Sequence, residues 1–281
     1  KYAAAAAQKL VNLDKVNALV SFYGYGGGAV APIAEIARTP HLGLTLSREA
    51  AKPAYSFVNE PSPEGSAKVM ADALVALNYK KVGILSARSQ GPLLLAGALK
   101  AELVKRNIEC VDDSILTTER DMRTVQAKLR DWKCEAWVII LYPPQVDIFL
   151  TTYHQFKENT PITSIWSWEY VADKNMIEGL WYVAGTLPSK SFTLKFAEKH
   201  GREPLPMAVY SYDGIRMLSD ALLLSKGDKE ATRQCLAELK TFEGAAGIYT
   251  NDEDGFFDTP SVLLKVVNGK ATEILPSDLI K

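Results

Sequence analysis

The sequence has few residues of the kinds that build covalent or metal-held frameworks. Its cysteines, Cys110, Cys134 and Cys235, are odd in number and far apart in 281 residues. This spacing offers neither a disulfide framework nor the paired ligands of a zinc site. The three histidines are equally scattered. We therefore expect free, partly buried thiols and no metal site.

An excess of positive charge is also lacking. There are 32 Lys and Arg residues against 33 Asp and Glu residues, which gives a formal net charge of -1. Nucleic acids and anionic membrane surfaces are bound by proteins with a basic excess, so neither is an expected partner. No uninterrupted apolar run approaches the ~20 residues of a membrane-spanning helix. The longest, such as residues 136–141, have the length of a strand.

Nucleophile motifs are missing as well. The sequence contains no G-x-S-x-G and no S-x-x-K pattern. Tyr153 and Lys157 spell the Y-x-x-x-K of short-chain dehydrogenases, but they lie in an amphipathic segment where a solvated tyrosine and lysine explain them more simply. No catalytic set emerges, so we expect a protein without enzymatic activity and without a cofactor.

What is present is a repeated succession of strand and helix. The segments 81–85 and 136–141 are apolar without alternation, which is typical of strands buried on both faces of a parallel sheet. The pattern predicts strands at 17–22, 41–46, 81–86, 109–116, 136–141, 162–166 and 180–184, and a C-terminal hairpin at 261–267 and 271–274. It predicts helices near the N-terminus and at 29–37, 66–77, 91–106, 121–132, 145–157, 192–200, 207–225 and 229–239.

Three loop-like stretches interrupt this succession, at 61–63, 185–189 and 249–255. Three crossings indicate two lobes that share the chain discontinuously. We expect an α/β fold of two Rossmann-like lobes, each a parallel sheet flanked by helices, joined by a three-segment hinge. Lobe 1 would comprise 1–61 plus 188–248, and lobe 2 would comprise 62–187 plus 249–281.

A glycine cluster, VSFYGYGGGA at residues 20–29, follows the first expected strand and precedes an expected helix at Ala29. Gly24, Gly26 and Ala29 satisfy the dinucleotide pattern G-x-G-x-x-A. Arg48, after the next strand, would suit a 2′-phosphate. However, the chain leaves for a proline-rich crossover after one more strand, whereas the dinucleotide fold continues with further βαβ repeats. An NADP-dependent oxidoreductase therefore stays an alternative to a loop that holds a ligand head group.

The polar segment 250–261 partly matches a calcium-binding loop. With Gly255 in sixth place, Asp252 and Asp254 take positions three and five, but Thr250 and Ser261 fall at positions one and twelve. Two main ligands are thus missing, which favours a polar turn.

Aromatic and hydroxyl side chains gather where the expected strands end. Open α/β sheets bind ligands just beyond the carboxyl ends of their strands. Tyrosine and tryptophan can enclose an apolar group and still offer a polar tip, and the carboxylate of Glu169 could pair with an ammonium group. The residues at these ends are Tyr23, Tyr25, Thr45, Ser47, Tyr142, Trp166, Trp168, Glu169 and Tyr170.

In the order of its segments the chain resembles type I periplasmic binding proteins of the Leu/Ile/Val-binding group, the substrate-binding components of ABC importers. The resemblance covers essentially the whole chain. It is carried by AAAAAQKLVNLDKVNALVS, VAPIAEIARTPHLGLTLS, YSFVNEPSPEGSAKVMADALVALNYKKVGILSA, MAVYSYDGIRMLSDAL with its pair Tyr212–Asp213, and DGFFDTPSVLLKVVNGK. It also implies a further strand, helix and strand before Lys1.

The resemblance implies a ligand site. By position, Gly24, Thr45 and Ser47 match the family's residues that grip a ligand's α-carboxylate and amine, while Tyr142 and Glu169 match the residues that close over it. The rings of Tyr23, Tyr25 and Trp168 complete the expected set. Family members usually carry Ser or Thr where this chain has GYGGG. Here backbone N–H groups at a helix N-terminus would hold the anion, and a bulkier or aromatic carboxylate becomes plausible.

The function implied by the resemblance is capture without chemistry. An extracytoplasmic protein, periplasmic or extracellular, would bind an amino acid or small carboxylate by hinge closure and present it to a membrane ABC permease. A ligand-sensing receptor or regulator module of the same fold is an alternative.

Overall fold

The computed structural model describes residues 2–251 and 254–280; the side chain of Tyr25 is outside the described part. The chain forms two compact units. Unit 1 comprises Lys1–Ser62 and Thr186–Pro260, and unit 2 comprises Pro63–Gly185 and Ser261–Lys281. The chain therefore passes between the units at 62–63, 185–186 and 260–261. Both units combine a sheet containing parallel strands with flanking helices, so the expected α/β class is confirmed.

Unit 1 is built on a six-stranded sheet of order β1-β2-β3-β11-β10-β9. Its first four strands run parallel, and β10 and β9 extend the sheet as an antiparallel pair. The strands are β1 (Leu19–Phe22), β2 (His41–Leu44), β3 (Ser56–Asn59), β9 (Thr241–Gly244), β10 (Gly247–Asn251) and β11 (Phe256–Asp258).

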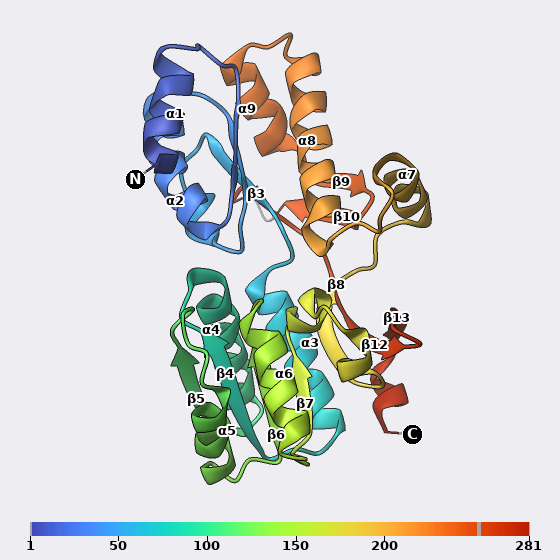
Figure 1. Ribbon diagram of the computed structural model, residues 1–281. Coiled ribbons are helices and arrows are strands. Elements are labelled where there is room, and N and C mark those ends of the chain that lie inside the picture. Colours follow the sequence, from blue (N-terminus) through green and yellow to red (C-terminus); the bar gives the residue numbers. More distant parts are fainter. Residues whose placement is uncertain (1, 252–253, 281) are drawn as a thin grey trace. The chain divides into compact units, whose positions relative to one another are not determined.

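Helices cover both faces of this sheet. Leu19 packs with Val30 and Ala34 of α2, whereas Gly214 of α8 lies against Leu42. Since Leu19 pairs with His41, and Leu42 is the next residue along β2, the two helices pack on opposite faces. In Figure 1, α1 and α2 are blue and α8 and α9 orange. The helices are α1 (Tyr2–Asn12), α2 (Gly24–Ile36), α7 (Lys190–His200), α8 (Pro206–Leu224) and α9 (Lys229–Glu238), with the 3-10 turn η1 (Arg48–Ala50).

Unit 2 contains a parallel sheet of order β5-β4-β6-β7 and an antiparallel sheet of order β13-β12-β8, linked by an isolated bridge between Ile165 and Val183. The strands are β4 (Lys81–Ala87), β5 (Glu109–Ile115), β6 (Ala136–Ile140), β7 (Ile162–Ser164), β8 (Trp181–Gly185), β12 (Ser261–Val267) and β13 (Lys270–Ile274). The helices, green to cyan in Figure 1, are α3 (Pro63–Ala76), α4 (Gln90–Lys105), α5 (Met122–Asp131) and α6 (Gln145–Gln155). The 3-10 turns are η2 (Ser167–Tyr170), η3 (Lys174–Ile177) and η4 (Pro276–Leu279).

The structure corrects the expected chain boundary at residue 249. Residues 249–251 and 254–260 lie in unit 1, because β11 pairs in parallel with β3 and β10 pairs with both β11 and β9. The sequence pattern predicts no strand at the residues of β3, which lie in the proline-rich crossover. Prolines flank this strand at 53 and 61, but its own four residues, SFVN, are all buried. Prolines therefore bound the strand without interrupting it.

A second correction concerns the glycine cluster. The helix starts at Gly24 and not at Ala29, so these glycines form the first turns of α2. Gly27 shows why a small residue is needed there: a Cβ atom at Gly27 would lie 3.2 Å from Cγ2 of Thr45 and 3.4 Å from Cβ of Ala50. The low helix propensity of glycine is thus offset by close packing of the helix on the strand end.

Candidate functional site

The carboxyl ends of three parallel strands meet at one edge of the unit 1 sheet. Phe22 of β1 lies opposite Leu44 of β2, and the N–H of Tyr23 donates to the carbonyl of Leu44 at 2.9 Å. β3 lies on the other side of β2 in parallel register. The residues that follow β1 and β2, including the expected site residues Tyr23, Gly24 and Thr45, are thereby brought to the same edge.

The N-terminus of α2 opens directly at this edge. Tyr23 has a positive φ (φ 64°, ψ 154°), and its side chain does not cap the helix. The Tyr23 carbonyl accepts from the N–H of Gly27 at 3.0 Å, which is the first intrahelical bond. The N–H groups of the first turn have no partner within a helix and carry the positive end of its dipole. This geometry can hold an anion through backbone N–H groups. The Tyr23 ring is 77% exposed.

Thr45 and Ser47 follow β2 and are both buried. The Thr45 hydroxyl oxygen accepts from the N–H of Ser47 at 3.2 Å, which fixes the turn. The Ser47 hydroxyl makes no hydrogen bond with another described residue. The structure therefore assembles Tyr23, Gly24, Thr45 and Ser47 as one polar cluster in unit 1.

Beneath this edge, a chain of polar side chains crosses the three parallel strands. His41 Nε2 lies 2.8 Å from the Ser21 hydroxyl, and its Nδ1 lies 3.0 Å from the Ser56 hydroxyl. Burial lowers the pKa of His41 to about 4, so the ring is neutral near pH 7. Because both ring nitrogens are occupied and the ring is buried, His41 is a structural residue of the sheet.

Glu60 is a candidate that sequence reasoning missed. It directly follows β3 and is only 5% exposed, yet it forms no hydrogen bond or ion pair with another described residue. Burial raises the pKa of its carboxyl group to about 8. A buried carboxyl group without a partner at the binding edge of a sheet is a functional candidate. The signal that would reveal it is the apolar strand SFV before Asn59-Glu60, hidden between the flanking prolines.

In unit 2, the parallel strands β6 and β7 end at a shared edge, with Ile139 opposite Ser164. Ser167 ties the following turn to β6: its hydroxyl oxygen accepts from the N–H of Leu141 and donates to the carbonyl of Ile139, both at 2.9 Å. Tyr142 is half-buried, and its ring meets that of Tyr170 edge-on at a centroid distance of 5.4 Å. Rings are thus presented at this edge.

The structure places Trp168 and Glu169 differently within that turn. Trp168 is fully buried, and its indole N–H has no partner among the described residues. Glu169 is partly exposed, and its Oε1 accepts from the Tyr182 hydroxyl at 2.5 Å. Lys174 donates to the carbonyls of Trp168 and Glu169 at 2.7 and 3.1 Å. Burial raises the pKa of Glu169, while the Tyr182 hydroxyl and the Lys174 ammonium oppose that rise.

A second missed candidate is Gln90, the first residue of α4. It comes three residues after the end of β4, which is parallel to β6 at the same edge. Its Oε1 is buried without a partner among the described residues. The segment Ser89-Gln90 after KVGIL repeats, in unit 2, the strand-to-helix junction found at Tyr23 and Gly24.

The residues whose motifs suggested other functions make contacts within the fold. The Arg48 guanidinium forms an ion pair with Asp254 at 2.8 Å and lies over the Phe256 ring. The Tyr153 hydroxyl donates to the carbonyl of Thr160 at 2.8 Å. Asp252, one of the expected calcium ligands, lies outside the described residues. Within the part of the chain that is described, no cluster of three metal-ligating side chains occurs, and no helix is long and apolar enough to cross a membrane.

The two clusters differ in what they can bind. The unit 1 cluster offers backbone N–H groups and hydroxyls, which suit an anion. The unit 2 cluster offers rings and a carboxylate, which suit an apolar group or a cation. Among their described residues, neither cluster contains a nucleophile hydrogen-bonded to a base.

Comparison with known proteins agrees with this description. A family model described as "Periplasmic binding protein" matches residues 1–271. A leucine-binding protein, LivK, from Thermotoga maritima has a TM-score of 0.86 at 20% identity, over 98% of this chain and 85% of that chain. LivJ from Streptococcus pneumoniae, solved with isoleucine, has a TM-score of 0.84 at 19% identity, over 97% and 84%.

A solute-binding protein of an ABC transporter from R. palustris, solved with benzoate, has a TM-score of 0.85 at 15% identity, over 97% of this chain and 80% of that chain. No curated protein matches this chain in sequence. The family match confirms the resemblance and favours solute binding over a sensing module or an oxidoreductase. Members of the family are solute-binding proteins, and this chain belongs to the periplasmic binding protein family.

Proposed function

We propose that this protein captures a small carboxylate, an amino acid or an aromatic acid, outside the cytoplasm and delivers it to the membrane permease of an ABC importer. The family match supports this function, and relatives in ABC transporters support the permease as partner. The family match also supports the proposed extracytoplasmic location. No chemical step is part of the proposal.

One observation carries the proposed ligand class. The uncapped N-terminus of α2 lies at the same strand edge as Thr45, against which Gly27 packs. Backbone N–H groups and hydroxyls at such a junction favour a carboxylate. The ligands named for similar structures share this group: isoleucine, leucine, benzoate and 3,4-dihydroxybenzoic acid. Their other ends have no common group, so the carboxylate is the part that we assign to unit 1.

The rest of the ligand is assigned to unit 2. We propose that Tyr142 contacts its apolar part and that Glu169 accepts a hydrogen bond from an amine or hydroxyl, if the ligand has one. Trp168 is buried, so its proposed role is to anchor the η2 turn by packing in the core of unit 2. Tyr23, with its exposed ring, is proposed as a further contact in unit 1. The Tyr25 side chain lies outside the described residues and stays a sequence prediction.

The test is a thermal-shift screen with matched ligand pairs. Leucine is compared with leucinamide, which lacks the carboxylate, and with 4-methylpentanoate, which lacks the amine; benzoate is compared with benzamide. A ligand at 100 times its Kd stabilises the protein by about 2.7 kcal/mol. We expect the acids to stabilise the protein and the amides to have no effect. Equal responses to acids and amides, or saturable NADPH binding without any acid response, would contradict the proposal.

Variants locate the response in the chain. Thr45→Ala and Ser47→Ala should weaken binding of every responding acid, because both act on the shared carboxylate. Glu169→Gln should weaken the binding only of ligands that carry an amine or a hydroxyl group. Ser219→Ala is the matched control, since Ser219 is exposed on α8 of the same unit. If Ser219→Ala weakens binding as much as Thr45→Ala, the assigned cluster is wrong.

A further inference from the structure

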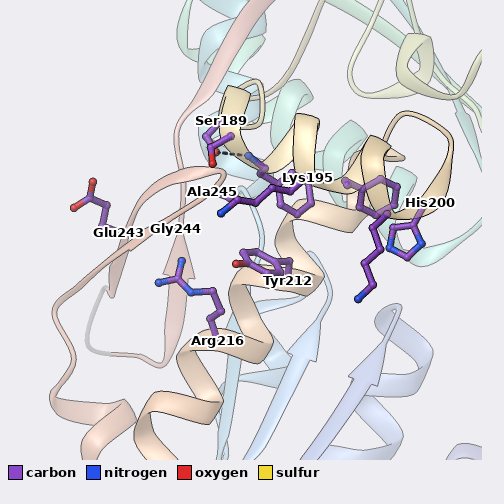
Figure 2. A pocket seen from close by; sticks show the side chains of 12 residues that line it. Ser189, Lys195, His200, Tyr212, Arg216, Glu243, Gly244 and Ala245 are labelled. Atoms are coloured by element: carbon purple, nitrogen blue, oxygen red, sulfur yellow. Dashed lines mark hydrogen bonds between the residues drawn. The ribbon is translucent and has the colours of Figure 1, made fainter.

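A cavity of about 650 Å³ is lined by residues of unit 1, and neither α2 nor Thr45 contributes to its lining. Its walls come from α7, the middle of α8, and the end of β9 with the residue that follows it (Figure 2). None of the expected site residues lines it. Its size falls within the range usual for small-molecule sites.

The charged side chains around this cavity are mostly of one sign. Lys195, Lys199 and Arg216 line it against one acidic residue, Glu243. None of these three cations takes part in an ion pair between described residues. Lys199 lies in the last turn of α7, where a cation stabilises the helix dipole. Lys195 and Arg216 are in mid-helix, so that explanation does not extend to them. Figure 2 shows both beside the Tyr212 ring.

Aromatic rings form the apolar wall. The centroid of the Phe192 ring lies 5.8 Å from that of Phe196 and 5.2 Å from that of Tyr212. The Arg216 guanidinium lies 5.8 Å from the Tyr212 ring centroid. No residue of α7 is fully buried, and Tyr212 of α8 is exposed, so these rings are only partly covered by the protein. A wall of rings flanked by cations complements a planar ring that carries a negative charge.

The opposite wall is held rigidly. The Asp213 carboxylate accepts from the N–H groups of Ala245 and Ala246 at 2.7 and 2.8 Å, which fixes the turn between β9 and β10. Ser189 donates its own N–H to the carbonyl of Ala245 at 2.7 Å, and its hydroxyl caps α7 by accepting from Phe192 at 3.3 Å. The start of α7 is thus tied to the same turn. These fixed backbone contacts make the cavity a built feature of unit 1.

We propose that this cavity is a second binding site, for an aromatic carboxylate, separate from the ligand site of the proposed function. The carboxylate pairs with Lys195 and Arg216, and the ring packs on Phe192 and Tyr212. The volume accommodates acids larger than benzoate, so benzoate is the smallest probe of the site.

The test is photolabelling with 4-azidobenzoate followed by peptide mapping. We expect labelled peptides within residues 189–216, with the labelling competed by benzoate and at least fivefold less by benzamide. Labelling confined to other peptides, or equal competition by the acid and the amide, would overturn the proposal.

Paired variants separate this site from that of the proposed function. Lys195→Gln/Arg216→Gln should reduce labelling of these peptides at least fivefold, and each single variant should reduce it partially. The control Lys68→Gln/Lys190→Gln removes the same charge from exposed lysines outside the cavity and should leave labelling unchanged. Thr45→Ala/Ser47→Ala should also leave it unchanged. Loss of labelling in that last variant would show that the probe sits in the other site, and would overturn the second site alone.

Discussion

The two units differ in what their interiors contain. Of the described acidic, basic and histidine side chains, the buried ones are His41, Glu60 and Asp213, and all three lie in unit 1. The central strand β6 of unit 2 is AWVII, buried along its whole length. Burying an ionisable group ties stability to its protonation and its partners. The comparison teaches that unit 1 should respond to pH and to single polar substitutions, whereas unit 2 should respond mainly to packing.

The distribution of tryptophan allows the comparison to be measured. All five tryptophans lie in unit 2: Trp132, Trp137, Trp166, Trp168 and Trp181. Tryptophan fluorescence therefore follows unfolding of unit 2, while hydrogen exchange of peptides from residues 2–62 and 186–251 follows unit 1.

Among the substitutions, the largest loss of stability is expected from Asp213→Ala. This buried carboxylate accepts from the N–H groups of Ala245 and Ala246 and from the Tyr249 hydroxyl. Its removal leaves buried donors without an acceptor, and we expect unit 1 to lose about 3 kcal/mol or more of unfolding free energy. Exchange should accelerate in unit 1 peptides. Asp220→Ala, on the exposed face of the same helix, is the control. If only the unfolding followed by tryptophan fluorescence were destabilised, the effect would lie in unit 2, and Asp213 would not be an anchor of unit 1.

Glu60→Gln should change how stability depends on pH. The folded pKa of Glu60, about 8, lies above its ordinary value of 4.5. The unfolded chain therefore releases this proton first, and stability falls as pH rises from 4.5 to 8, by about 1.4 kcal/mol for each pKa unit fully traversed. The variant should lose this decline in denaturant titrations at pH 5 and pH 8. Glu203→Gln, at an exposed position, should keep it. If stability declined equally in both variants between pH 5 and pH 8, Glu60 would not be the cause of the decline.

His41 should also make stability depend on pH, but at acidic pH and in the opposite direction to Glu60. Its folded pKa of about 4 lies below the ordinary value of 6.5, so the unfolded chain binds a proton first as the pH falls. Stability is then lost from pH 6.5 down to pH 4. An NMR titration of the imidazole protons gives the folded pKa directly. A midpoint near 6.5 would mean that the ring is not held neutral by the sheet.

Ser167→Ala should have the smallest effect, in unit 2. It removes a neutral hydroxyl that serves Leu141 N–H and the Ile139 carbonyl. Leaving these buried groups without partners costs about 1–2 kcal/mol, less than loss of the charged anchor in unit 1. Fluorescence-detected unfolding should show this loss. Thr118→Ala is the control at an exposed position, and equal losses in the two variants would refute the anchor.

Sequence patterns were informative where apolar runs dominate. The expected strands 81–86 and 136–141 match β4 and β6 to within one residue at each end, because strands buried on both faces need uninterrupted apolar side chains. The start of α2 was misplaced because its glycines are poor helix formers. Their packing against Thr45 and Ala50 depends on contacts about 20 residues away. β3 was missed because its prolines suggested a loop.

The candidate site was predictable in outline only. The cluster of Tyr23, Gly24, Thr45 and Ser47 follows from strand ends that parallel pairing brings to one edge. Burial of Trp168 and the hydrogen bond between Tyr182 and Glu169 depend on how η2 folds back onto β6 and β8. Such contacts have no counterpart in local spacing. The apolar residues SFV place Glu60 at a strand end, but no local pattern shows that its carboxyl group lacks a partner among the described residues.

The start of α2 carries an evolutionary consequence. If main-chain amides at the start of α2 hold the acid group, substitution of the side chains in that turn cannot delete their share of the recognition, because every residue type other than proline supplies the same donor. Proteins that diverge from this chain would then keep their affinity for carboxylates, while the side chains that contact the rest of the ligand change. Specificity for a new ligand would arise from changes in the residues that contact its variable end, with the carboxylate contacts left unchanged.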